Sequence, residues 1–216
     1  MKNLIYICFT TLLLIACKQK AETKVVETER TIAEKIGHAH GFENWKNVSE
    51  IAFTFNRNRS WKWQPKTNDV TFIQDTLEVS YNRAKIDSTV IKIDPAFIND
   101  KFWLLIPFQL IWDKSATISE PIKAEAPISK TQMSKITLLY GKEGGYTPGD
   151  AYDIYFGDDY IIREWAFRKG NKQEAGLINT FENYQDFSGI KLALDHKKAE
   201  GDWNLELSNI EIVLKE

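Results

Sequence analysis

The sequence predicts an α+β fold with one large, strongly curved antiparallel β-sheet and two helical segments. The main observation is that most of the chain after residue 40 alternates apolar and polar residues with a period of two, as half-buried antiparallel strands do. Only two segments have helical patterns. The 216 residues include 43% hydrophobic and 27% charged residues, which is the composition of a globular protein and indicates a single folded domain.

The first 17 residues have the proportions of a secretory signal peptide. Lys2 supplies a positive charge, and the apolar run at 4–15 is shorter than the roughly 20 residues that a transmembrane helix needs. The run ends in Leu-Ile-Ala-Cys at 14–17, which resembles the lipobox of bacterial lipoprotein precursors. That resemblance implies removal of residues 1–16 and acylation of Cys17, since several acyl chains together anchor a protein stably. The alternative is an uncleaved signal anchor with an incidental cysteine.

Residues 17–30 are expected to be the acylated Cys17 followed by a polar, flexible tether. Lys18 stands after the cysteine, and the absence of aspartate there favours the outer membrane in bacteria with two membranes. We therefore expect a lipid-anchored protein of the bacterial cell envelope, facing the periplasm, with its folded domain at 31–216. The other cysteine, Cys8, also precedes that domain, so the domain has neither a disulfide nor a thiolate metal site.

Residues 31–40 are predicted to form the first helix, because Thr31 and Glu34 fit a capping box. Its apolar face consists of Ile32, Ala33, Ile36 and Ala39. His38 and His40 stand two residues apart at the helix end. Because such positions point to different faces of a helix, we expect ordinary histidines there and predict no metal and no cofactor.

The predicted strands are defined by alternating apolar residues. Before the second helix, the alternating sets are Ile51, Phe53 and Phe55; Trp61 and Trp63; Leu77, Val79 and Tyr81; and Ile91 and Ile93. After it, they are Ile136, Leu138 and Tyr140; Tyr152, Ile154 and Phe156; residues 161–167; Ile190, Leu192 and Leu194; Leu205 and Leu207; and Ile210, Ile212 and Leu214. Residues 56–60 and the Gly-Asp-Asp at 157–159 have the composition of hairpin turns.

The second helix is predicted to begin at Asp94-Pro95, with Asp94 as its cap and proline at its first position. The stretch at 102–112 is the most apolar of the mature chain, and Pro107 is expected to break it. It is too short to span a bilayer. Residues 113–135 are polar and indicate a long loop with room for a short edge strand, and such loops are often functional lids.

The order of these features resembles the LolA/LolB-like lipoprotein-localisation fold: a lipobox, a helix, aromatic-rich strands, a second helical insertion and further strands. The segments GYTPGDAY at 145–152, IIREWAF at 161–167 and FENYQDFSGIK at 181–191 resemble uncharacterised bacterial lipoproteins of this type. The resemblance implies an unclosed β-barrel whose helices cover the concave face and whose cavity holds acyl chains. It covers the chain from about Thr31 to Leu214, and no functional residue of the carriers maps onto this sequence.

The apolar stretch at 102–112 has two interpretations, which stay open: a core helix packed on the sheet, or the lid of an apolar cavity. The candidate hydrophobic ligand-binding residues are Phe53, Phe55, Trp61, Trp63, Phe102, Trp103, Phe108 and Trp112. The polar loop that follows would let such a lid shift.

Other patterns have simpler explanations. Basic residues interleave with the tryptophans of one predicted strand pair, namely Arg57, Arg59, Lys62 and Lys66. They indicate a solvated basic face or, alternatively, a surface for anionic lipid or envelope glycan. The net charge of −2 argues against nucleic acid as a partner. The aspartates at 150, 153, 158 and 159 lack the spacing of an EF-hand loop.

Three functions follow, and the sequence does not decide between them. The first is a non-enzymatic binder of a hydrophobic ligand, such as an acyl chain or a lipoprotein anchor, held at the membrane by its own lipid. The second is an envelope interaction or structural lipoprotein with a filled core. The third, a periplasmic hydrolase, has less support, because the chain lacks Gly-x-Ser-x-Gly, His-Glu-x-x-His and glycine-rich phosphate motifs.

Overall fold

The computed structural model describes residues 29–215, so the expected signal peptide at 1–16, the acylation of Cys17 and most of the tether lie outside the described residues. The described part contains the helices α1 (Ile32–Ala39) and α2 (Asp94–Trp112) and the short 3₁₀ helices η1 (Phe42–Asn47) and η2 (Lys169–Asn171). The strands are β1 (Val48–Phe55), β2 (Arg59–Gln64), β3 (Asp69–Gln74), β4 (Leu77–Asn82), β5 (Ala116–Ile118), β6 (Ile122–Glu125), β7 (Gln132–Tyr140), β8 (Ala151–Phe156), β9 (Ile162–Arg168), β10 (Leu177–Thr180), β11 (Glu182–Phe187), β12 (Ile190–Lys197) and β13 (Asn204–Leu214).

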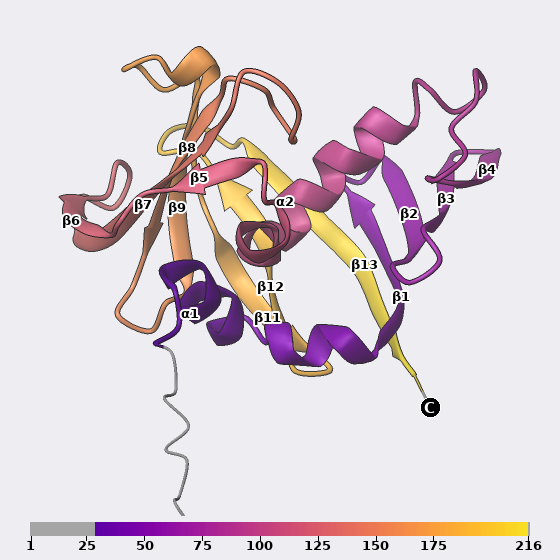
Figure 1. Cartoon of the computed structure of the whole chain (residues 1–216), viewed down its shortest axis with the longest axis horizontal. Helices are drawn as coiled ribbons and strands as arrows, with labels where there is room; N and C mark the ends of the chain where they lie inside the picture. Colours follow the sequence, from indigo (N-terminus) through magenta and orange to yellow (C-terminus); the bar gives the residue numbers. More distant parts are fainter. Residues whose placement is uncertain (1–28, 216) are drawn as a thin grey trace, which may run out of the picture.

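The strands form two antiparallel sheets, where the alternation predicts one (Figure 1). The first sheet has the order β11-β12-β13-β1-β2-β3-β4. The second has the order β10-β9-β8-β7-β5, and β6 also pairs with β7. The α+β class is therefore confirmed, and within residues 29–215 neither sheet closes into a barrel.

The chain passes from one sheet to the other at Phe181. The Phe181 amide donates a hydrogen bond to the Arg163 carbonyl of β9, over 2.7 Å. The next residue, Glu182, is already paired with Asp195 of β12. One extended segment thus changes partners, and alternation cannot reveal this because its period continues unchanged through the crossing.

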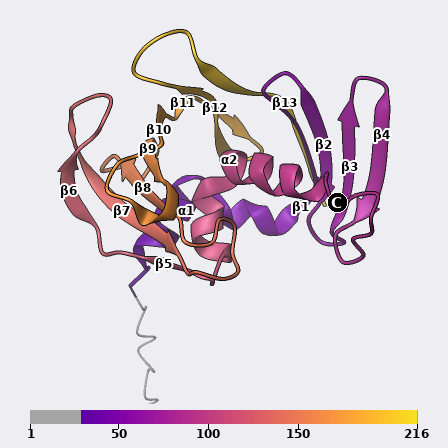
Figure 2. The same ribbon diagram turned by 90° about the horizontal axis from the view of Figure 1, so that it is seen from above.

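Helix α2 lies between the two sheets (Figure 1, Figure 2). On one side the Phe97 ring packs on Trp61 of β2, with ring centroids 5.4 Å apart. On the other side Trp103 packs on Trp165 of β9, with centroids 4.6 Å apart. Residues 102–108 of α2 are all buried, as expected for an apolar helical segment that packs between two sheets.

Pro107 bends α2 but does not end it. The helix continues to Trp112, and the bend is at Leu105, whose φ of −119° and ψ of 26° are not helical. Proline has no N–H and its ring crowds the preceding turn, so the distortion two residues before it is the expected effect. The predicted cap is also wrong: Ile93 occupies that position, and the Asp94 carboxylate instead accepts hydrogen bonds from Arg83 and from the Tyr81 hydroxyl.

The capping box of α1 and the hairpins β1–β2 and β8–β9 are confirmed. Other predictions need correction. Ile91 and Ile93 lie in a turn, where Asp87 accepts from the backbone and hydroxyl of Thr89, and not in a strand. Strand β3 is one that the alternation did not predict. The loop at 113–135 contains both β5 and β6, and the last two predicted strands are one continuous strand, β13.

Candidate functional site

Seven of the eight candidate ligand-binding residues are buried in the core, and Trp112 is half-buried. Phe53 and Phe55 lie on β1, Trp61 and Trp63 lie on β2, and the other four lie on α2. They belong to a single cluster of buried apolar side chains. The core-helix interpretation of 102–112 therefore describes what the structure shows at these residues.

The aromatic residues of α2 contact different neighbours. Phe102 stacks on Tyr146, with ring centroids 3.9 Å apart, and Trp103 packs on Trp165 and on His196. Trp165 belongs to the second sheet, His196 belongs to β12 of the first sheet, and Tyr146 lies in the loop before β8, so these two residues contact neither β1 nor β2 through aromatic pairs.

Trp45 of η1 joins the two groups of aromatic residues. Its ring lies 5.6 Å from the Trp63 ring, 5.6 Å from that of Phe108 and 5.0 Å from that of Trp112, measured between centroids. The sequence pattern does not single out Trp45, because η1 is too short to have a detectable period. The feature of the sequence that indicates a buried residue there is a tryptophan within a short polar stretch.

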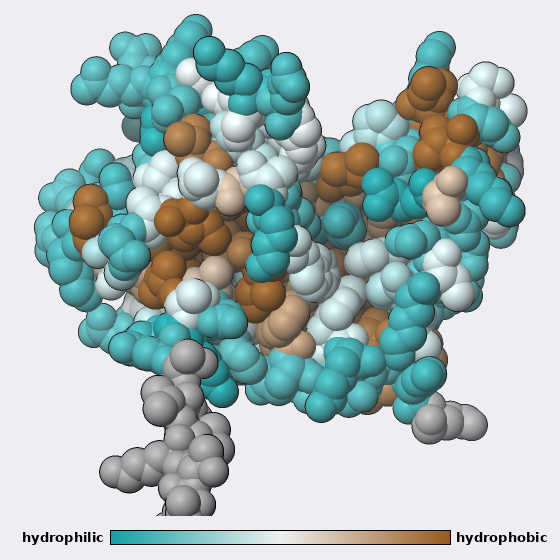
Figure 3. Space-filling model, viewed as in Figure 1, coloured by the Kyte–Doolittle hydropathy of each residue, from teal (hydrophilic) through white to brown (hydrophobic). Residues whose placement is uncertain are grey.

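A cavity of about 590 Å³ opens between α1, the C-terminal end of α2 and β5. We call it the α1–α2 cavity. None of the eight aromatic candidates lines it. On the face shown in Figure 3, hydrophobic surface gathers in this region and is ringed by hydrophilic residues. The cavity thus lies at the edge of the core, open to solvent, beside the point where the described chain begins.

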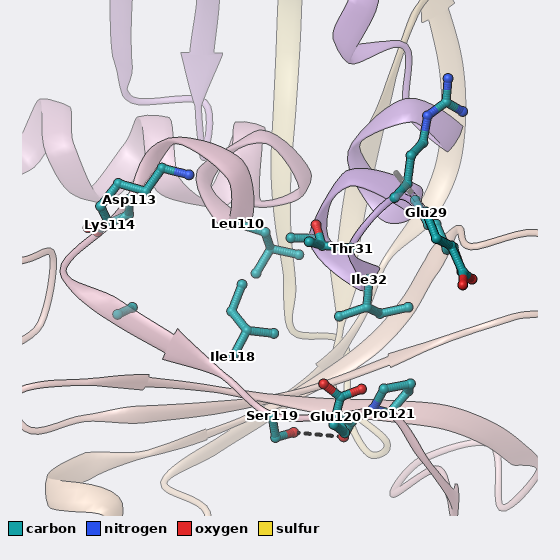
Figure 4. A pocket seen from close by; sticks show the side chains of 14 residues that line it. Glu29, Thr31, Ile32, Leu110, Asp113, Lys114, Ile118, Ser119, Glu120 and Pro121 are labelled. Atoms are coloured by element: carbon teal, nitrogen blue, oxygen red, sulfur yellow. Dashed lines mark hydrogen bonds and ion pairs between the residues drawn. The ribbon is translucent and has the colours of Figure 1, made fainter. Parts of the chain in front are cut away.

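The floor of the α1–α2 cavity is apolar. Ile32 of α1, Leu110 of α2 and Ile118 of β5 point toward one another across it (Figure 4). Ala33 and Ala116 complete this floor and leave space because their side chains are small. The capping box fixes the first turn of α1, since the Thr31 hydroxyl accepts from the Glu34 amide and the Glu34 carboxylate accepts from the Thr31 amide.

The rim of the cavity is charged. Lys35 pairs with Glu29 at 2.8 Å, and this hydrogen bond raises the pKa of Lys35 and lowers that of Glu29. Partial burial opposes ionisation of Asp113, but hydrogen bonds from the hydroxyl and amide of Ser115 hold the pKa of that carboxyl below its usual value. Arg30 and Lys114 add two further cations to the rim.

The two helix-end histidines have different environments. His40 is fully buried, and its Nδ1 lies 2.8 Å from the Ile36 carbonyl oxygen. His38 lies near the surface, with its Nδ1 3.0 Å from a Glu43 carboxylate oxygen. Burial lowers the pKa of His40 to about 4, so His40 is neutral at pH 7. The two rings do not share a ligand site.

The interleaved basic residues do not form one free basic face. Arg57 pairs with Glu206, and Arg59 forms a bidentate pair with Asp100 of α2 at 2.8 and 2.7 Å. Arg59 shares the inward face of β2 with Trp61 and Trp63, while Lys62 is exposed. The solvated-face interpretation is confirmed for Lys62 and Lys66, and it is wrong for Arg59.

The four aspartates at 150–159 are each bound to a protein partner. Asp153 pairs with Arg168, Asp158 with Lys123 and Asp159 with Arg163, and Asp150 accepts from the Gly170 amide. Among the described residues, no group of three or more His, Cys, Asp or Glu side chains is placed to hold a metal ion. In the same part of the chain, no helix has the length and apolarity needed to cross a membrane.

No protein-family model matches the chain, and neither a curated protein nor a solved structure matches it.

Proposed function

We propose that the protein is a lipid-anchored lipoprotein of the bacterial envelope that binds an acyl chain, without catalysis, in the α1–α2 cavity. The observation that carries this proposal is the cavity itself, whose apolar floor and charged rim suit one amphipathic molecule. Its volume of about 590 Å³ lies within the roughly 300–1,000 Å³ of small-molecule sites. The anchor at Cys17 and the outer-membrane location belong to the same proposal and depend on the lipobox-like segment.

Binding would depend on burial of methylene groups against the floor. Each buried methylene contributes roughly 0.8 kcal/mol, so a chain with six to eight methylenes on the floor gains about 5–6 kcal/mol before the cost of ordering it. The charged rim would keep the polar head of the ligand at the mouth, which Arg30, Lys114 and Asp113 help to line. In this proposal the aromatic core is the scaffold and the cavity at its edge is the site.

The LolA/LolB-like identity is part of the proposal as well. Its support is the combination of antiparallel sheets with a buried apolar helix between them. The second candidate, an envelope protein with a filled core, is favoured by the burial of Phe53, Trp61, Phe102 and Phe108, each about 1% exposed. The two differ in whether lipid enters the α1–α2 cavity.

The experiment compares two tryptophan variants of the mature chain made soluble by Cys17→Ser. Ile118→Trp fills the cavity and should weaken binding of a fluorescent fatty acid at least tenfold. Val213→Trp is the matched control, because Val213 is an aliphatic strand residue that is 51% exposed and lies on β13. Equal binding by both variants, or no uptake of probe by the parent protein at micromolar concentration, would contradict the proposal. Either result would favour the second candidate, the envelope protein with a filled core.

A further inference from the structure

A second cavity, of about 300 Å³, lies beside α2; of its lining residues, Asp113 also lines the α1–α2 cavity and the others do not. Its α2 wall includes Ile98, Lys101, Phe102, Gln109 and Trp112, which recur at helical spacing. Arg83, just after β4, and the loop before β8 form the other walls. We call it the Lys101 cavity.

Lys101 is a half-buried cation held by aromatic rings. Its ammonium lies 5.4 Å from the centroid of Trp63 and 5.9 Å from that of Trp112. Within residues 29–215 its Nζ makes neither a hydrogen bond nor an ion pair, whereas Arg59 and Arg83 each bind a carboxylate. Indole faces attract a cation but accept no strong hydrogen bond, so the N–H groups of Lys101 that face the cavity can bind an acceptor that enters it.

The charges around Lys101 agree with this geometry. Burial, and to a lesser extent the nearby Arg83 guanidinium, lowers the pKa of Lys101 to about 8, while Asp113 and Asp94 act in the opposite direction. Both carboxylates have other partners: Asp94 binds Arg83, and Asp113 binds Ser115 and Gln109. An anion that entered the cavity would supply the acceptor that Lys101 lacks.

The loop wall of the cavity is fixed in place. Gly145 has φ of +76°, and a Cβ there would lie 2.5 Å from Ser115 Oγ and 2.5 Å from the Tyr140 ring, so only glycine fits. The following residue, Tyr146, stacks on Phe102 and donates its hydroxyl proton to the Asn99 side-chain oxygen at 2.8 Å. A wall formed before a ligand arrives reduces the ordering cost of binding.

We propose that the Lys101 cavity binds a short-chain carboxylate, with the carboxylate on the Lys101 ammonium and the alkyl part against Ile98, Phe102 and Trp112. The volume is at the lower end of small-molecule sites, which favours a chain shorter than a membrane acyl chain. Arg83, which is paired with Asp94, lines the same cavity, so Lys101 is the cation there without a carboxylate partner among the described residues. The proposal does not depend on acyl-chain binding in the α1–α2 cavity.

The test follows Lys101 itself by NMR titration of its side chain in the full mature chain carrying Cys17→Ser. Octanoate is the probe, and octanol and inorganic phosphate are the matched comparisons. An ion pair favours the charged form, so saturating octanoate should raise the Lys101 pKa by at least one unit, and octanol should leave it unchanged. Lys101→Met should weaken octanoate binding at this site at least tenfold, whereas Lys92→Met, on the turn before α2, should not.

Ile118→Trp keeps this result separate from the first proposal, because it fills the α1–α2 cavity and should leave the shift at Lys101 intact. The inference is overturned if octanoate does not move the Lys101 pKa. It is overturned equally if octanol produces the same shift, since the site would then select apolar chains only. A shift with phosphate alone, at the same concentration, would replace the carboxylate by another anion and also reject the proposal.

Discussion

Asp100→Ala tests the contact that fastens α2 to the first sheet. Asp100 is fully buried, and its carboxylate accepts four hydrogen bonds: two from Arg59, one from Trp61 Nε1 and one from Asn99. The substitution would leave the Arg59 guanidinium and the Trp61 indole N–H without their acceptor. Removing one partner of a buried ion pair costs about 3–5 kcal/mol, because the other charge stays buried and unpaired.

The value expected here is at the low end of that range. The Arg59 side chain is 29% exposed, so water can solvate part of the guanidinium after the change. We therefore expect a loss of about 3 kcal/mol in the free energy of unfolding. For a chain of this size the midpoint of thermal unfolding should fall by about 6–12 °C. Urea denaturation followed by tryptophan fluorescence measures the first quantity, and calorimetry measures the second.

Two variants control the interpretation. Asp158→Ala removes the Asp158–Lys123 pair, whose aspartate side chain is 94% exposed, and should change stability by less than about 0.5 kcal/mol. The double change Arg59→Met with Asp100→Leu should lose less than Asp100→Ala alone, since no unpaired charge remains. A loss below about 1 kcal/mol for Asp100→Ala would refute the reasoning and mean that the pair does not hold α2 in place.

Four further outcomes follow from the sequence and the structure. Cys17→Ser should move the protein to the soluble or unprocessed fraction. If the variant is processed and still fractionates with membranes, that result would contradict the lipoprotein proposal. His40→Ala should lower the free energy of unfolding, measured by urea denaturation, by about 2 kcal/mol, because His40 is buried and hydrogen-bonded to the Ile36 carbonyl. The surface change His38→Ala should leave that free energy almost unchanged, and the sequence alone predicts little effect from either change. Burial lowers the pKa of both His40 and His196 to about 4, so between pH 6.5 and 4 the unfolded chain binds more protons than the folded chain. The free energy of unfolding should therefore decrease as the pH is lowered through that window, by up to about 3 kcal/mol for each histidine. A His196→Phe variant with the same pH dependence as the parent protein would contradict this. Trp103→Ala should cost about 3–5 kcal/mol and leave fatty-acid binding unchanged, because Trp103 packs on Trp165 and does not line the α1–α2 cavity.

Local patterns in the sequence determined the elements whose stabilising contacts are themselves local. The capping box of Thr31 and Glu34 lies within one turn, and the hairpin turns at 56–58 and 157–161 join strands that pair with their neighbours in the chain. The lipobox-like segment is likewise a short linear pattern. Each of these depends on residues only a few positions apart, so composition and spacing are sufficient to find it.

Only the tertiary structure decided what covers each apolar face. Alternation shows that Trp61 and Trp63 point inward, but not that Phe97 of α2 meets them, nor that Phe181 carries the chain into a second sheet. Arg59 shares their inward face, which requires a buried partner, yet Asp100 lies 41 residues further along the chain. The α1–α2 cavity likewise combines residues from α1, α2 and β5. These juxtapositions depend on how whole elements pack, and the spacing of residues within one element does not contain that information.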